Sequence, residues 1–172
     1  MTKPNKLPPY EVVNYFLKYD SKTGIVTWKF TASKYMKAGK RVGWLDTQGY
    51  YSTRFLTRNY KLHRLCWLLH YKEDPGGMCV DHIDGNKINN KINNLRLATY
   101  QQNRINSGTR SDNKTGATGV SWSKRSNCYI AKVTIDNKAV YSGHFHCLEE
   151  AIQARNNAAN RIFKEFARID NS

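Results

Sequence analysis

The sequence predicts an α+β protein in two parts. The first is a β-rich leader that runs into a compact ββα unit, and the second is a three-stranded antiparallel sheet packed on one helix. Three observations predict this class: short β-branched and aromatic runs are bounded by turn residues, few segments carry a helical apolar stripe, and one polar segment divides the chain. A length of 172 residues suits one domain or two small ones.

The leader begins with a short amphipathic helix. Residues 10–17 place four apolar side chains on one helical face, directly after Pro8-Pro9. Residues 20–24 form a turn signal, and we expect further turns at Gln48-Gly49 and Arg58-Asn59. The runs that predict strands here are residues 25–30, 42–45 and 50–56.

The central part reads as helix, strand, strand, helix. Residues 62–70 have an inward apolar face and predict a helix. Residues 80–84 and 95–99 predict two strands, joined by an asparagine-rich connection. Residues 100–105 should open a second helix, with Thr99 as its N-cap.

The tail is a separate compact pattern. Residues 107–116 are polar and lack apolar periodicity, which predicts a flexible linker between residues 1–106 and 117–172. Asp136-Asn137 is a turn signal, and residues 148–167 carry a continuous apolar stripe that predicts the best helix of the chain. The predicted strands of the tail are residues 118–123, 129–135 and 138–145.

The charge points to a polyanionic partner. The chain has 28 Lys and Arg against 13 Asp and Glu, a formal net charge of +15, and a pI of about 9.8. Such an excess favours nucleic acid through counterion release, and the alternative is a solvated basic surface. Most of the excess lies in residues 1–116. The charge therefore predicts a nucleic-acid partner.

The cysteines and apolar runs exclude several classes. Cys66, Cys79, Cys128 and Cys147 form no CxxC pair, so we expect neither a structural zinc site nor a disulfide framework. No apolar run is long enough to span a membrane, and no signal peptide is present. The sequence therefore predicts a cytoplasmic protein without a membrane partner.

Asp81, His82 and Asn103 have the chemistry for phosphodiester hydrolysis. A carboxylate and an amide oxygen suit one Mg²⁺ or Mn²⁺ ion and leave positions for phosphate oxygens. A histidine, whose pKa lies near neutrality, suits the base that activates water. Adjacent side chains on a strand point to opposite faces, however, so residue order does not settle how Asp81 and His82 serve one site. The alternative is that Asp-Gly-Asn is only a turn, and for Asp84 the turn role is favoured.

The segment VDHIDGNKINNKINNLRLATYQQN resembles the core of the HNH endonucleases, the ββα-metal nucleases, in the phage and intron-encoded branch whose last letter is Asn. The preceding HRLCWLLHY and TGIVTWKF…GYYSTRF resemble the leader of phage HNH proteins, so the resemblance covers about residues 10–106. Many relatives hold zinc with cysteines around this core. This chain lacks them, and the hydrophobic leader is expected to brace the core instead.

The resemblance implies four roles. Asp81 would be a metal ligand and His82 the base, and Asn103, 21 residues after His82, would be the second ligand. Asn94, 12 residues after His82, would brace the loop and orient the histidine. Asn90 is the alternative for this middle position.

The other histidines have competing interpretations. His63 could assist the site, although packing against the hairpin is favoured. His70 is expected to be a helix-end residue. His144 and His146 have a spacing that could bind a metal, but further ligands nearby are missing.

Residues 117–167 resemble the AP2 DNA-binding domain, which lays a three-stranded sheet in the major groove. The match includes Gly119-Val120, the Tyr129-Ile130-Ala131 strand and Ala158-Ala159. Cys147 departs from the usual Ser or Thr at the helix cap, and Ser121 departs from a frequent basic residue. The alternatives are core packing for the aromatic residues and a solvated face for the charged ones. The tail residues placed to reach DNA are Trp122, Lys124, Arg125, Tyr129, Lys132, Lys138 and Tyr141.

These readings combine into a two-part DNA endonuclease, of homing type and possible nickase activity, that cuts with its first part and holds flanking DNA with its tail. The partner that the resemblances imply is double-stranded DNA, bound by a monomer, and we expect further DNA contacts from Arg96, Arg104 and Arg110. One alternative is a sequence-specific DNA-binding regulator with an inactive nuclease core, and another is an RNA-binding or RNA-cutting protein.

Overall fold

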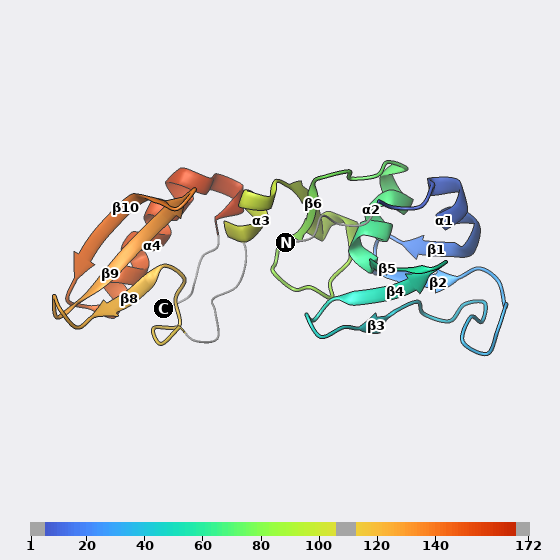
Figure 1. Cartoon of the computed structure of the whole chain (residues 1–172), viewed down its shortest axis with the longest axis horizontal. Helices are drawn as coiled ribbons and strands as arrows, with labels where there is room; N and C mark the ends of the chain where they lie inside the picture. The colour runs from blue at the N-terminus through green and yellow to red at the C-terminus, as the bar shows by residue number, and fades with distance from the viewer. Residues whose placement is uncertain (1–5, 106–112, 168–172) are drawn as a thin grey trace. The chain divides into compact units, whose positions relative to one another are not determined.

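The computed structural model describes residues 6–105 and 113–167. The chain divides into two compact units, Met1–Tyr100 and Gln101–Ser172. The described residues form four α-helices and four small sheets, and all paired strands are antiparallel (Figure 1). The predicted α+β class is confirmed. None of the described helices is both long and apolar enough to cross a membrane.

The leader is a helix that passes directly into a hairpin. α1 (Tyr10–Phe16) ends because the backbone becomes extended at Leu17, with φ −116° and ψ 140°. The chain continues as β1 (Leu17–Asp20), which pairs with β2 (Ile25–Trp28). The sequence prediction placed Leu17 on the helix and missed β1. Leu17 is fully buried. An apolar residue suits a buried position on a helix and on a strand alike, so its apolar character could not distinguish these two structures.

The second sheet contains a strand that the sequence prediction had read as a turn. Its strands are β3 (Trp44–Leu45), β4 (Tyr51–Phe55) and β5 (Arg58–Lys61). The prediction of a turn at Arg58-Asn59 was wrong, because the chain reverses two residues earlier, at Leu56-Thr57, where Leu56 adopts a left-handed conformation with φ 55°. β5 runs without a break into α2 (Leu62–Tyr71), and this helix was predicted.

The third sheet is the hairpin of β6 (Cys79–His82) and β7 (Leu95–Ala98). Its connection ends in a 3₁₀ turn, η1 (Ile92–Asn94), and α3 (Tyr100–Ile105) follows β7. The strand–strand–helix order matches the prediction. The first strand ends at His82, two residues earlier than predicted, because Gly85 N–H donates to the His82 carbonyl and closes a turn.

One core joins the three sheets of the first unit. The leader contributes Leu17 and Val26, α2 contributes Leu65, and the hairpin contributes Val80 and Leu95. Full burial of each such side chain stabilises the fold by about 1.5–3 kcal/mol. This continuous core attaches the leader to the hairpin.

The second unit is a three-stranded sheet with one helix across it (Figure 1). Its strands are β8 (Val120–Ser123), β9 (Cys128–Ile135) and β10 (Lys138–Phe145), in the order β10-β9-β8. α4 (Leu148–Phe163) is shorter than predicted, because Lys164 turns to φ 50° before a 3₁₀ turn, η2 (Lys164–Phe166). The helix packs Ala151 and Ile152 against the sheet, so the predicted sheet-on-helix architecture is confirmed.

Candidate active site

A cluster of buried polar side chains lies where β6 ends. Asp81 is 6% exposed, His82 4% and Asn90 2%, and Asn94 is also buried. Polar groups at this depth destabilise a fold by about 1–3 kcal/mol each unless hydrogen bonds satisfy them. The contacts of each side chain therefore indicate what the cluster is arranged to do.

His82 is oriented by Asn90. The distance between His82 Nε2 and Asn90 Oδ1 is 2.9 Å. An amide oxygen can only accept, so with this amide orientation the proton of the neutral imidazole lies on Nε2. The lone pair then lies on Nδ1, the nitrogen that can take a proton from water.

Two further rings pack against His82. The His63 ring meets it edge to face, with 5.0 Å between centroids, and the Tyr50 centroid lies 6.0 Å away. Burial lowers the pKa of His82 below its usual value, although the Asn90 hydrogen bond opposes that shift. Burial also lowers the pKa of His63, with the His82 charge adding to the effect. Both imidazoles are accordingly neutral at neutral pH, as a general base requires.

Asn94 holds the loop after the histidine. Its Oδ1 accepts from the Asp84 N–H at 3.0 Å, and its Nδ2 donates to Asp84 Oδ1 at 2.9 Å and to the Asn89 carbonyl at 2.8 Å. Burial acts to raise the pKa of Asp84, but hydrogen bonds from the Asn89 and Asn94 amides outweigh it and lower that pKa. Asp84 thus organises the turn. The loop-bracing and histidine-orienting roles expected of Asn94 are divided between Asn94 and Asn90.

The leader hairpin supports the same loop from the other side. The Tyr19 hydroxyl donates to the Asn90 carbonyl at 2.7 Å, and Ile92 N–H donates to the Ser21 carbonyl at 3.1 Å. Gly24 has φ +75°, and a Cβ there would lie 2.6 Å from the Lys91 nitrogen. The leader therefore braces the loop directly, as expected for a core without zinc cysteines.

Asp81 lies across the hairpin from Arg96. The two residues are register partners, and Arg96 Nε donates to Asp81 Oδ2 at 2.9 Å. This partner supplies the positive charge that a buried carboxylate needs. Arg96, which the sequence predicted to contact DNA, thus contacts Asp81.

The predicted metal ligands supply only oxygen donors. Asp81 offers a carboxylate held in place by Arg96, and Asn103 offers an amide oxygen from α3. This donor set fits a hard cation such as Mg²⁺. Across residues 6–105 and 113–167 there is no group of three or more His, Cys, Asp and Glu that could hold a metal.

The tail aromatics lie on the helix side of their sheet. Tyr129 lies two residues before Ala131 and four before Val133, both buried, so it projects to the same face of β9. Tyr129 and Tyr141 pack partly against the core. Trp122 is the register partner of Tyr129, and their ring centroids lie 4.7 Å apart.

The predicted basic contacts of the tail are exposed. Lys132 is exposed on the opposite face of β9. The remaining basic positions, Lys124, Arg125 and Lys138, are also exposed, as is Arg104 on α3, whereas Arg110 lies outside the described residues.

Comparison with known proteins finds a family model that matches the segment around the cluster. Residues 60–105, from β5 to α3, match the family model described as HNH endonuclease. The segment is therefore similar to HNH endonucleases. It includes both strands of the hairpin, the asparagine loop and all four residues to which roles were assigned.

Relatives of the HNH segment occur in viruses. The chain is 40% identical over 108 residues to "Uncharacterized HNH endonuclease L560" of Acanthamoeba polyphaga mimivirus, covering 62% of this chain and 55% of that protein. It is 42% identical over 64 residues to "Protein 3.8" of Escherichia phage T7, covering 37% and 53%. The chain thus spans about half the length of these curated relatives.

A solved structure is also similar. Its title is "DNA binding and cleavage by the HNH homing endonuclease I-HmuI"; the identity is 28%, the TM-score is 0.38, and the match covers 53% of this chain and 51% of that one.

Local patterns could not find several residues around His82. Tyr50 and Tyr19 reach the site from separate hairpins, and nothing in their own neighbourhoods marks them. The sequence pointed to Asn90 only weakly, as one of several asparagines in the loop, eight residues after His82. Which of the loop asparagines reaches the imidazole depends on the path of the loop backbone.

Proposed function

We propose that this protein is a metal-dependent DNA endonuclease that hydrolyses phosphodiester bonds. The observation that carries the proposal is His82, a buried and neutral imidazole fixed through Nε2 by Asn90, next in sequence to the buried carboxylate of Asp81. The match of residues 60–105 to the HNH endonuclease model supports it.

The residues divide the reaction between them. His82 Nδ1 accepts a proton from a water molecule whose oxygen attacks phosphorus, and the bond to the 3′ oxygen breaks. A Mg²⁺ ion bound by Asp81 and Asn103 would stabilise charge on the phosphate and on the leaving oxygen. Asn90 keeps the lone pair on Nδ1, and Asn94 keeps the loop in place.

The supports of the base come from several elements. His63 at the start of α2 and Tyr50 before β4 pack against the ring, and the leader holds the loop through Tyr19. Because these contacts fix the imidazole before DNA binds, little reorganisation is needed in the reaction. A single such site in one chain favours nicking over double-strand cleavage.

We further propose that the tail binds DNA beside the cut, as the AP2 resemblance implies. The exposed basic positions of the sheet and its turns are suited to phosphates. Tethering a DNA-binding unit to the nuclease raises the effective concentration of DNA at the site. Homing is the role that best fits this arrangement.

Metal binding and cleavage together test the proposal. Mn²⁺ binding, followed by electron paramagnetic resonance, should weaken at least tenfold in an Asp81→Ala, Asn103→Ala double variant, because both oxygen ligands are lost. Glu11→Gln, which removes an exposed carboxylate from the first turn of α1, is the control and should bind as wild type does. Supercoiled plasmid should be nicked by the wild type with Mg²⁺ and left intact by the double variant. Tight DNA binding without any metal-dependent cutting would instead indicate a regulator with an inactive core.

A further inference from the structure

The outer face of the sheet β3–β4–β5 carries a row of side chains from all three strands. Trp44 on β3 pairs with Ser52 on β4, and Ser52 pairs with Lys61 on β5. Register partners project to the same face of a sheet, so the three lie side by side. Arg54 follows two residues after Ser52 on β4, which places it on this face as well, and it is exposed.

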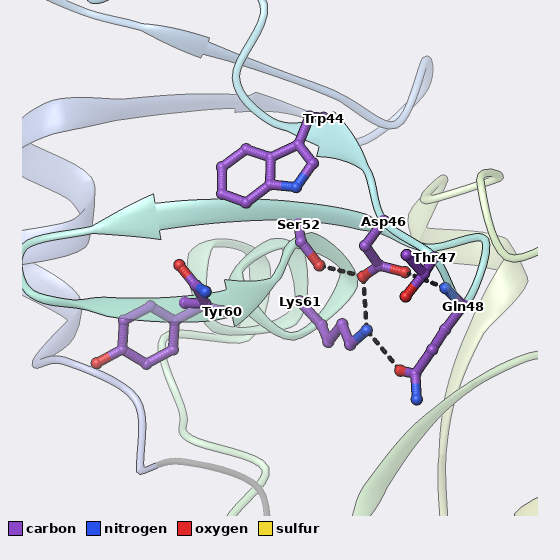
Figure 2. A pocket seen from close by; sticks show the side chains of 8 residues that line it. Trp44, Asp46, Thr47, Gln48, Ser52, Tyr60 and Lys61 are labelled. Carbon is purple, nitrogen blue, oxygen red and sulfur yellow. Dashed lines mark hydrogen bonds and ion pairs between the residues drawn. The ribbon is translucent and has the colours of Figure 1, made fainter.

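A hollow of about 270 Å³ opens on this face between Trp44 and Lys61 (Figure 2). Its polar side is fixed, since Asp46 accepts hydrogen bonds from Ser52 and from Lys61 at 2.6 Å, and Lys61 donates to Gln48 Oε1 at 2.8 Å. Trp44 is nevertheless 48% exposed. The hollow therefore presents an indole ring to solvent beside an ordered polar network.

The same face is continuous with the surroundings of His82. Lys61 Nζ and Lys87 Nζ each lie 4.9 Å from the centre of the Tyr50 ring, and that ring packs 6.0 Å from His82. Lys87 is exposed, and its Nζ donates to the Gln48 carbonyl at 3.0 Å. Lys87 thus connects the edge of the hollow with the base.

From this arrangement we propose that the outer face of β3–β4–β5 binds the DNA strand that flanks the scissile phosphate. Lys87 and Arg54 contact phosphates, and Trp44 packs against a nucleotide of the same strand. The inference rests on the proposed nuclease function, because it takes His82 as the position of the cut.

Charge and spacing favour this occupant. Each strand of duplex DNA carries one charge about every 3.4 Å along the helix axis, so a phosphate at His82 brings its neighbours onto the adjoining surface. Lys61 is paired with Asp46, which leaves the exposed cations Arg54 and Lys87 to set the sign of the face. An exposed aromatic ring between cations can pack against a sugar of the duplex backbone while the cations contact its phosphates, a contact that does not depend on base sequence.

The test compares four variants of the full chain by fluorescence anisotropy on a labelled duplex, without divalent metal, over a series of salt concentrations. Arg54→Gln and Lys87→Gln should each weaken binding and lower the slope of log K against log salt by about 0.9, the value for one phosphate contact. Trp44→Leu should weaken binding about fivefold while the slope stays at the wild-type value, because the lost contact is apolar and not ionic.

Lys72→Gln is the matched control. Lys72 is exposed at the C-terminal cap of α2, nine residues after His63 and hence about 13 Å along the helix from the site. It should bind with wild-type affinity and slope. The proposal is overturned if Arg54→Gln and Lys87→Gln behave like Lys72→Gln, or if Trp44→Leu changes only a self-association measured by light scattering.

This readout separates the inference from the nuclease proposal. Binding without metal does not require cleavage, so a wild type that binds through this face and cuts no DNA would refute the proposed function alone. Variants that bind as the wild type does, in a protein that cuts DNA, would refute the surface alone.

Discussion

The two units of this chain use their cores differently. In residues 1–100 the buried polar side chains include His82, Asn90 and Asn94. Their contacts reach β1 through Tyr19, the residue before β4 through Tyr50, and α2 through His63. In residues 101–172 two small clusters, rich in alanine, hold one helix to one sheet. The first arrangement fixes individual side chains, which suits the proposed catalysis, whereas the second supports an exposed sheet surface, which suits the proposed binding of DNA.

The same contrast applies to two asparagines within the first unit. Asn94 is satisfied entirely by the loop around Asp84, while Asn90 reaches across to the imidazole of His82. Asn94 therefore maintains the shape of the loop, and Asn90 links the loop to the base through its hydrogen bond to His82. Variants of each unit and of each asparagine test these differences.

The largest effect is expected at the contact between leader and loop. Gly24→Ala should lower the free energy of unfolding by about 3–4 kcal/mol, since its Cβ would meet backbone atoms of Asn90 and Lys91 at a positive φ. Gly39→Ala is the control: it has nearly the same φ, +76°, with open space around it, and should cost about 1 kcal/mol. Urea denaturation measures both, and equal midpoints would show that the leader does not brace the loop.

Asn90→Ala should slow cleavage about 10–100-fold at saturating DNA and leave DNA affinity unchanged, because the imidazole loses the partner that fixes its tautomer. Asn94→Ala should mainly reduce stability, by about 1–3 kcal/mol, since it leaves polar atoms of the loop unsatisfied. Single-turnover kinetics and thermal unfolding distinguish the two. Identical profiles for both variants would remove the division of roles.

Gly119→Ala tests the second unit in the same way as Gly24→Ala tests the first. Gly119 has φ +75°, and its Cβ would collide with the Lys132 carbonyl oxygen. The variant should unfold the tail at lower temperature and weaken DNA binding, while the cleavage rate at saturating DNA remains within about twofold of wild type. A rate that falls with the tail's stability would mean that the tail takes part in catalysis.

The smallest effect concerns the Asp46–Lys61 pair, which supports the outer face of β3–β4–β5. Burial acts to raise the pKa of Asp46, but hydrogen bonds from Lys61 and Ser52 lower it below its usual value. Its stabilising contribution is therefore present above the unfolded pKa, near 3.8, and is lost as pH falls through the folded pKa. Asp46→Asn should be about 1 kcal/mol less stable than wild type at pH 7, and the difference should shrink below pH 4. A difference independent of pH would contradict this account.

Local sequence patterns were sufficient for elements whose apolar period is complete. The stripe of α2, the hairpin signal around residues 80–99 and the turn at Asp136-Asn137 each appear in the structure close to where they were predicted. The prediction failed where a segment changes period without a turn residue, as at Leu17, and where an unexpected residue reverses the chain, as at Leu56.

The candidate site was predictable in its residue types and less so in its contacts. Residue type and the resemblance to HNH endonucleases pointed to Asp81, His82 and Asn94, all of which lie in the buried cluster. It could not show that Asn90 holds His82 or that Arg96 pairs with Asp81, because those contacts depend on loop path and strand register. How Asn103 joins Asp81 stays a prediction.

The central claim is that His82 is the base of a nuclease. Its most direct test is single-turnover cleavage of a plasmid by His82→Ala with Mg²⁺, with DNA affinity measured in parallel. We expect the rate to fall by about 10²–10⁴-fold at unchanged affinity, and added imidazole to restore part of it. Cleavage by His82→Ala at the wild-type rate would contradict the account.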